Sequence, residues 1–207
     1  MPTISNELLN DIRSKFAQID SCPVQGQRVF FENAGGALTL NRVVDVSRDY
    51  AAIPDNQGRD NPGSHELVRV IQKAKDDLRV FMNAPSGQFF VGESGTELIF
   101  RLVMNACLGT EDGGVVLGST VEHPATRSAC ARWSKVSRKT HVLIAHDDDL
   151  GLVKAEDYTA HVTQATKVAT ILHTSPVTGM GMDVAAISKA IRAVSYTHLT
   201  LPTKWIV

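Results

Sequence analysis

Three residues in a glycine-containing loop, Ser94, Gly95 and Thr96, are of the types that bind phosphate. The loop has the sequence Gly-Glu-Ser-Gly-Thr over residues 92–96 and is followed by a helical pattern. The first N–H groups of a helix have no partner within the helix, so they can donate to a phosphate together with a nearby hydroxyl group. Serine and threonine are also common capping residues, and a plain helix cap is the alternative interpretation. No lysine follows the glycine, which excludes a Walker A loop.

A second candidate is His123, which comes after an apolar run and directly before Pro124. An imidazole in this position could stack on a planar ligand or transfer protons near neutral pH. The alternative is a loop histidine that makes only structural hydrogen bonds. Two other loops, residues 33–36 and 173–179, are rich in small and polar residues and could bring the backbone close to a ligand, although tight turns explain them equally well.

Two further groups of residues suggest a metal site at first sight but do not support one. The acidic run at residues 147–149 has no further oxygen ligands at the spacing of a calcium loop. The histidines at positions 141, 146 and 161 have no companions at zinc-binding spacing. The sequence therefore predicts no metal site.

Alternating strands and helices are expected to position these loops. The periodicity of apolar residues predicts helices over residues 5–19, 40–52, 64–81, 95–108, 124–133, 154–162 and 183–192, and strands over residues 28–31, 88–91, 114–118, 141–145 and 167–173. This order implies crossover connections and a mostly parallel sheet covered by helices, so the predicted fold class is α/β. Ligands of such sheets bind beyond the carboxyl ends of the strands, where these loops lie.

Composition limits the possible partners. The 207 residues include 21 basic and 22 acidic side chains, a net charge of -1 that gives no overall basic field for nucleic acid or anionic lipid. The apolar runs are too short to cross a membrane, and the first ten residues do not form a secretory signal. The three cysteines, without C-x-x-C spacing, are typical of reduced thiols in the cytoplasm. We therefore expect a cytoplasmic protein that binds neither nucleic acid nor membranes.

Four segments, taken in order, resemble the class V aminotransferase group of pyridoxal-phosphate enzymes, which includes the cysteine desulfurases and their relatives. The segments are Phe-Glu-Asn-Ala-Gly-Gly at 31–36, Gly-Glu-Ser-Gly-Thr-Glu at 92–97, Val-Glu-His-Pro-Ala at 121–125 and Thr-Ser-Pro-Val-Thr-Gly at 174–179. The resemblance covers about residues 28–192. It implies fold type I, a three-layer αβα domain with a mostly parallel sheet, and pyridoxal 5'-phosphate as cofactor.

The resemblance also implies roles for individual residues. Ser94, Gly95 and Thr96 would bind the cofactor phosphate, and His123 would stack on the pyridine ring and assist proton transfer. Ala34 and Gly35 would lie near the substrate carboxylate. One position departs from the family: where relatives often have an asparagine that reaches the ring oxygen, this chain has Pro176, which has no N–H to donate. Either a neighbour such as Ser175 substitutes, or the ring is held differently.

In the family, the aspartate that pairs with the pyridinium nitrogen, the lysine that forms the Schiff base and the desulfurase cysteine all come later than Arg192. We therefore expect no catalytic residue in this chain. The resemblance implies an inactive fragment of a homodimeric transferase or lyase that acts on a small amino acid substrate. The alternative is a non-enzymatic α/β protein that binds a small phosphate-bearing ligand.

The last residues differ in character from the rest. Residues 194–203 show neither helical nor strand periodicity and resemble the translation of a transposase adapter used in sequencing libraries. We therefore expect residues 1–192 to be the N-terminal part of a pyridoxal-phosphate-dependent transferase-like domain. Residues 193–207 are expected to be a non-native tail, and residues 194–207 are expected to form no packed element of the fold.

Overall fold

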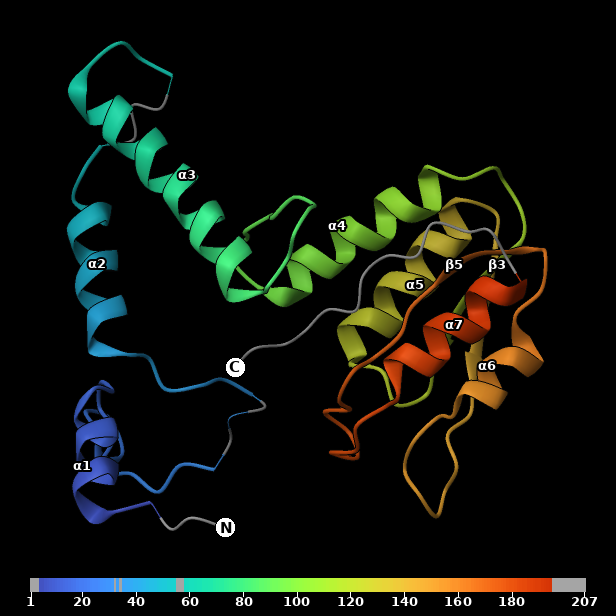
Figure 1. Ribbon diagram of the computed structural model, residues 1–207, viewed down its shortest axis with the longest axis horizontal. Coiled ribbons are helices and arrows are strands. Elements are labelled where there is room, and N and C mark those ends of the chain that lie inside the picture. Colours follow the sequence, from blue (N-terminus) through green and yellow to red (C-terminus); the bar gives the residue numbers. More distant parts are fainter. Residues whose placement is uncertain (1–3, 32, 34, 55–57, 195–207) are drawn as a thin grey trace. The chain divides into compact units, whose positions relative to one another are not determined.

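The computed structural model describes residues 4–31, 33, 35–54 and 58–194 (Figure 1). The chain divides into two compact units, one ending at Phe89 and the other beginning at Phe90. Each unit is described by itself below. Among the described residues, no helix combines the length and the apolar character needed to cross a bilayer.

The described residues of the first unit form three helices and one small hairpin. Its elements are α1 (Asn6–Ser14), β1 (Ser21–Cys22), β2 (Gly26–Gln27), α2 (Asn41–Ala51) and α3 (Pro62–Phe81). The prediction of a strand over residues 28–31 is wrong, because the hairpin pairs β1 with β2 and ends at Gln27. The helix predicted over 5–19 ends at Ser14, and Gln18 has a positive φ of 57° that a continued helix would not allow.

The second unit is built around a parallel sheet. Its elements are α4 (Gly95–Leu108), β3 (Val115–Ser119), α5 (Pro124–Val136), β4 (Thr140–Ile144), α6 (Ala155–His161), β5 (Thr166–Ala169) and α7 (Val184–Val194). The strand order is β4-β3-β5, and both neighbours pair in parallel with β3. The prediction of a strand over 88–91 is wrong, because this segment pairs with no described strand.

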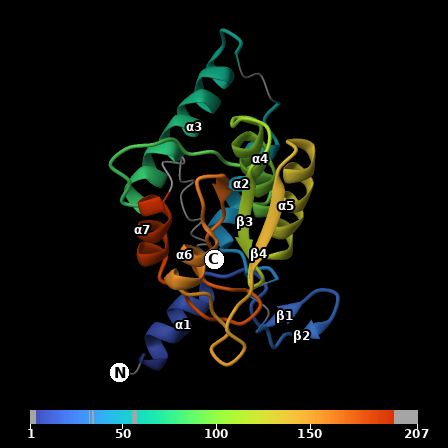
Figure 2. The same ribbon diagram turned by 90° about the vertical axis from the view of Figure 1, so that its right-hand side faces the viewer.

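Two apolar cores cover the two faces of this sheet. Successive residues of a strand point to opposite faces, and β3 shows this with its central pair. Val116 packs with residues of α4 and α5, such as Val103 and Ala129, whereas Leu117 packs with residues of α6 and α7, such as Tyr158 and Ile187. Figure 2 shows the helices on either side of the sheet. The predicted three-layer αβα arrangement is confirmed.

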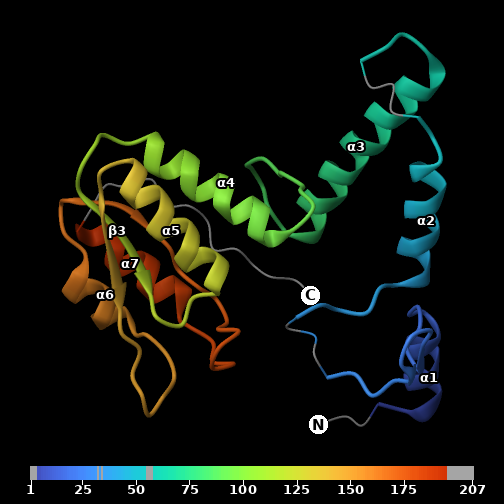
Figure 3. The same cartoon turned by 180° about the vertical axis from the view of Figure 1, so that it is seen from behind.

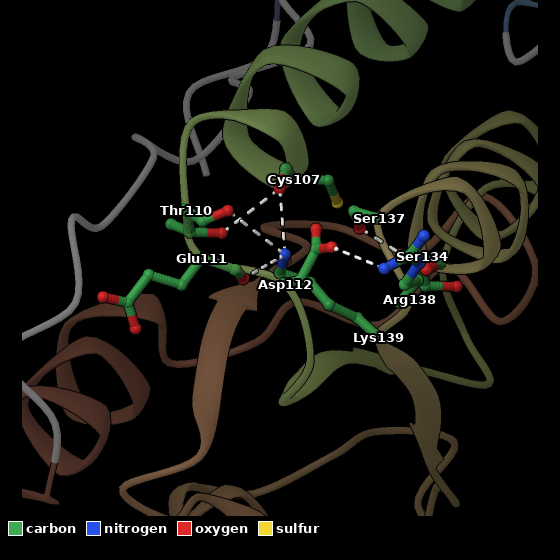
Figure 4. A network of polar contacts seen from close by, with 8 residues as sticks. All are labelled: Cys107, Thr110, Glu111, Asp112, Ser134, Ser137, Arg138 and Lys139. Atoms are coloured by element: carbon green, nitrogen blue, oxygen red, sulfur yellow. Dashed lines mark hydrogen bonds and ion pairs between the residues drawn. The ribbon is translucent and has the colours of Figure 1, made fainter.

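A buried lysine caps the carboxyl end of α4. Lys139 is 6% exposed, and its Nζ donates to the carbonyl oxygens of Cys107 at 3.0 Å, Thr110 at 3.4 Å and Glu111 at 2.7 Å (Figure 4). The last carbonyl groups of a helix have no partner within the helix, and a cation interacts favourably with the negative end of the helix dipole. Lys139 directly precedes β4, so its hydrogen bonds connect the start of this strand to the end of α4 and to the loop that leads into β3.

Replacing Lys139 with methionine should destabilise the second unit by about 2 kcal/mol, because three carbonyl groups, of which that of Cys107 belongs to a buried residue, lose a charged donor. Lys135→Met is the matched control: Lys135 is exposed in the last turn of α5, and its loss should change stability by no more than about 0.5 kcal/mol. Urea unfolding followed by circular dichroism measures both. Equal stability of the two variants would contradict the capping role.

Candidate functional site

The candidate site lies at one end of the second unit, beyond the carboxyl ends of β3 and β5. Because α4 leads back to the start of β3 and α5 follows its end, both helices have their N-termini at this end. Figure 3 shows α4 and α5 side by side, running in the same direction. Two helix N-termini and the loops after the strands therefore share one edge, where ligands of open α/β sheets bind.

The structure places Gly95 and Thr96 in the first turn of α4. The Ser94 side chain is the N-cap, and its Oγ accepts a hydrogen bond from the Glu97 N–H at 3.1 Å. The first bond to a main-chain carbonyl is from Leu98 N to Ser94 O, at 3.1 Å, so the amides of Gly95 and Thr96 precede it. The predicted helix start is confirmed, and the Ser94 side chain caps the helix.

The loop before α4 is held in shape by Glu97. Its Oε2 accepts from the Glu93 N–H at 3.0 Å, and its Oε1 pairs with Arg101 at 2.8 Å. Gly92 is packed so closely that a Cβ atom there would lie 2.7 Å from Glu97 Oε2 and 2.8 Å from Leu98 Cδ2. A side chain at position 92 would therefore have to displace the glutamate that shapes this loop.

His123 is the N-cap of α5. Its Nδ1 accepts a hydrogen bond from the Ala125 N–H at 3.0 Å, so the neutral ring carries its proton on Nε2. The ring is half-buried. This hydrogen bond gives the histidine a structural role, and the same contact orients the ring at the edge of the sheet.

The turn that carries His123 is tied to both neighbouring strands. Thr120 N donates to Ile144 O at 2.9 Å, and Thr120 Oγ1 lies 2.8 Å from His146 Nδ1, beyond the end of β4. Val121 O accepts from Ser175 Oγ at 2.9 Å, in the loop after β5. These contacts hold the turn in place from two sides. The sequence alone gives His146 no role, and its contact with Thr120 shows that it helps to hold this turn in place.

The contacts of Ser175 show whether this residue can substitute for the asparagine that relatives often have at the position of Pro176. Ser175 is 2% exposed, it donates its one hydroxyl proton to Val121, and its Oγ accepts from the N–H groups of Val177 and Thr178 at 3.1 and 3.2 Å. A hydroxyl group engaged in this way has no proton left for a ligand. Ser175 therefore does not replace the asparagine that the family often has here.

Two residues, Ala34 and Gly35, are expected near a substrate carboxylate. Ala34 lies outside the described residues, and Gly35 is exposed in a turn of the first unit. For metals, the described histidine, cysteine, aspartate and glutamate side chains form no group of three or more that could hold an ion.

A residue that the sequence analysis did not single out for a role is Glu122, next to His123. It is 2% exposed, and burial raises the pKa of its carboxyl group from 4.5 to about 7, although Thr170 and Arg127 act in the opposite direction. The signal in the sequence is weak: a single acidic residue between Val121 and His123.

Comparison with known proteins identifies the family. The family model described as aminotransferase class-V matches residues 29–200. A probable cysteine desulfurase from Mycoplasma genitalium is 23% identical over 170 residues, which cover 80% of this chain and 40% of that protein.

Solved structures have the same fold. The apo structure of a cysteine desulfurase from Thermococcus onnurineus NA1 has a TM-score of 0.77 at 15% identity, and the match covers 92% of this chain and 46% of that one. A mutant of C-DES with glycine covalently linked to its PLP cofactor has a TM-score of 0.68 at 13% identity, covering 93% and 50%. The chain thus spans about half the length of these proteins. With the family model matched over most of its length, the chain belongs to the aminotransferase class V family.

Proposed function

We propose that the second unit binds pyridoxal 5'-phosphate, with the phosphate at Ser94, Gly95 and Thr96 and the pyridine ring against His123. The observation that carries this proposal is the common location of the α4 N-terminus and His123 at the carboxyl end of the parallel sheet. Family membership gives the cofactor its identity, since the C-DES relative has PLP in its site.

The donor set fits a phosphate. The N–H groups of Gly95 and Thr96, the exposed Thr96 hydroxyl and the positive end of the dipole of a 14-residue helix all favour a dianion. His123 offers a flat ring whose orientation is fixed by Ala125. When bound, pyridoxal phosphate supplies an electron sink for reactions at amino-acid carbon atoms.

For the complete protein we propose a homodimeric enzyme that acts on an amino acid, with carbon–sulfur cleavage the leading reaction because two of the relatives are named cysteine desulfurases. A reducing compartment such as the cytoplasm fits the buried thiols. Burial raises the pKa of Cys107, and raises that of Cys130 to about 12, so neither is a reactive thiolate at neutral pH.

We also propose that residues 1–192 are the N-terminal part of that enzyme and that residues 193–207 are not native to it. Ala193 and Val194 are the last two residues of α7, and Val194 packs against the core, so the expectation that the tail forms no packed element is wrong at Val194. Residues 195–207 lie outside the described residues, and the family match reaches residue 200. The sequence of the parent gene is therefore the test. Sequencing the parent gene without library adapters should reveal a reading frame that leaves the present one after Arg192. A natural gene that encodes residues 194–207 as printed would overturn this proposal.

Equilibrium dialysis of the 207-residue chain against pyridoxal phosphate tests the cofactor site. Thr96→Val should weaken binding about tenfold, because a hydrogen bond to a charged group is worth about 1.5–3 kcal/mol. His123→Ala should weaken it about fivefold through the loss of stacking. Thr159→Val, at an exposed position of α6, is the matched control and should leave the affinity unchanged.

The dialysis also separates the two candidate functions. If inorganic phosphate binds as tightly as pyridoxal phosphate and His123→Ala has no effect, the non-enzymatic phosphate-binding alternative is favoured. If both variants bind like the wild-type chain, the proposed site is wrong.

The bound cofactor should not become covalently attached to a lysine of this chain. Lys73 pairs with Asp77 at 2.7 Å, and Lys139 Nζ donates to three carbonyl groups, so both amino groups already have partners within the chain. Borohydride reduction after mixing, followed by peptide mass spectrometry, should find no stoichiometrically labelled lysine. Full labelling of a single lysine, together with turnover of an amino acid, would show that the chain is not an inactive fragment.

A further inference from the structure

One edge of the parallel sheet in the second unit is free. β4 stands at the end of the strand order, and in the part of the chain that the structure describes it pairs only with β3. Its sequence, Thr-His-Val-Leu-Ile over residues 140–144, contains no acidic residue, lysine, arginine or proline, and its register with β3 is regular. Charged residues, proline and bulges usually prevent an exposed strand edge from pairing with another chain. β4 has none of these, so its edge can accept an added strand.

The main-chain groups on the free edge belong to His141 and Leu143. Thr140 N donates to Gly114 O, directly before β3, at 2.8 Å. At the other end of β4, Ile144 O accepts from the N–H group of the residue directly after β3, at 2.9 Å. Successive residues of a strand direct their N–H and C=O groups to opposite sides. Those of His141 and Leu143 therefore point away from β3, toward the free edge.

The side chains of the same two residues line a pocket between β4 and α5. His141 pairs with Val116, which packs with residues of α4 and α5, and Leu143 lies two residues further on the same face. Figure 2 shows α5 beside β4. The pocket is open to solvent and has a volume of about 340 Å³; its lining residues are Pro124, Arg127, Ser128 and Ala131 from α5 and His141 and Leu143 from β4. A strand added to this edge would place every second side chain beside the pocket.

The charges around the pocket favour an acidic side chain. Arg127 is half-buried, and its guanidinium group makes neither a hydrogen bond nor an ion pair with any residue that the structure describes. Its attraction to the buried Glu122 is not accompanied by an ion pair. The Ser128 residue is exposed beside it, and α5 has two further basic residues, Arg132 and Lys135, and no acidic one. A guanidinium group and a hydroxyl group are both donors to a carboxylate.

We propose that the free edge of β4 and the pocket beside it bind an extended acidic peptide segment of a partner protein. The segment adds to the sheet as a further strand, and its main chain pairs with His141 and Leu143. One of its acidic side chains reaches Arg127 and Ser128. In this mode of recognition the main-chain hydrogen bonds give affinity, and the pocket gives selectivity. The proposal goes beyond the cofactor site and does not depend on it, because none of these four residues is among those proposed to hold the cofactor.

Nuclear magnetic resonance titration of the 207-residue chain with a synthetic peptide tests this surface. The probe is a seven-residue peptide of alternating valine and glutamate with blocked ends. The amide signals of His141 and Leu143 should shift, and their hydrogen exchange should slow. Exchange at Val142, whose N–H group points to β3, should change little and is the internal control. The same peptide with glutamine in place of glutamate should bind about tenfold more weakly, since it lacks the charge that Arg127 attracts.

Two arginine variants test the pocket itself. Arg127→Met should weaken binding of the glutamate peptide about tenfold. Arg132→Met removes the same charge from the same helix at a position that does not line the pocket, and it should change the affinity by less than about twofold. Equal effects of the two variants would overturn the pocket. Should Arg127→Met fail to fold, the glutamate and glutamine peptides compared on the wild-type chain measure the same contribution, and equal affinities would likewise overturn it.

Methylation of the peptide nitrogens tests the pairing along the edge. Alternate N–H groups of a strand point to opposite edges, so methylating the glutamate nitrogens and methylating the valine nitrogens should differ: one should abolish binding and the other should not. Equal binding by the two methylated peptides would overturn the proposal. If the signals of His141 and Leu143 shift with protein concentration in the absence of peptide, a second copy of the chain occupies the edge, and the proposed partner is wrong.

Discussion

Alanine in place of Gly114 is expected to destabilise the second unit by about 4 kcal/mol, from left-handed strain and steric overlap together. Gly114 has a φ of +85°, a conformation that side chains other than glycine rarely adopt. A Cβ atom at this position would lie 2.4 Å from Ala165 O and 2.8 Å from Lys167 Cγ. The Ala165 carbonyl oxygen cannot move away freely, because it accepts from Val115 N at 2.8 Å.

The neighbouring glycine is a matched control. Gly113 has a similar φ of +83°, but a Cβ atom there would meet nothing within 4 Å. Gly113→Ala should therefore show the conformational strain alone, about 1 kcal/mol. Urea unfolding of both variants measures the difference, which is the cost of the overlap with the backbone. If the two variants were equally stable, the close approach of Gly114 to Ala165 would be contradicted.

The sequence predicted the second unit well because its strands are short apolar runs placed between turn residues. The strands predicted over 114–118 and 141–145 are each shifted by only one residue, and the helix over 95–108 has the observed limits. The apolar segments 28–31 and 88–91 have the same local character but form no strand. A strand requires a neighbour to complete its hydrogen bonds, and periodicity along one segment carries no information about that neighbour.

The candidate site shows the same division between local and long-range information. The helix start at Gly95 and the position of His123 after β3 follow from residues close in sequence. The engagement of Ser175 with Val121 and the approach of Thr170 to Glu122 join residues about 50 positions apart, so no local pattern could predict them. The sequence therefore leaves two roles possible for Ser175, a cofactor ligand or a structural residue, and it contains no sign that Glu122 is buried.

The second large effect concerns the dependence of stability on pH. Burial raises the pKa of Glu122 from 4.5 to about 7, so the folded state binds a proton more tightly than the unfolded state does. The stability due to this proton is fully present below pH 4.5 and is lost as the pH rises through about 7. The shift corresponds to about 3 kcal/mol of unfolding free energy.

Glu122→Gln should remove this dependence. The amide has nearly the same shape and does not ionise, so the variant and the wild-type chain should be similarly stable near pH 4.5, whereas at pH 8 the variant should be more stable by up to about 3 kcal/mol. His141 acts in the opposite sense: burial lowers its pKa, so the stability that it contributes is lost as the pH falls. Because His141 is present in both proteins, its contribution cancels in the difference between them.

Urea unfolding at a series of pH values from 4.5 to 8 gives the difference curve. Glu156→Gln, at an exposed position in the first turn of α6, measures how much of the effect comes from removing one negative charge as such. A difference between Glu122→Gln and the wild-type chain that is constant across the series would mean that Glu122 is ionised in the folded chain throughout.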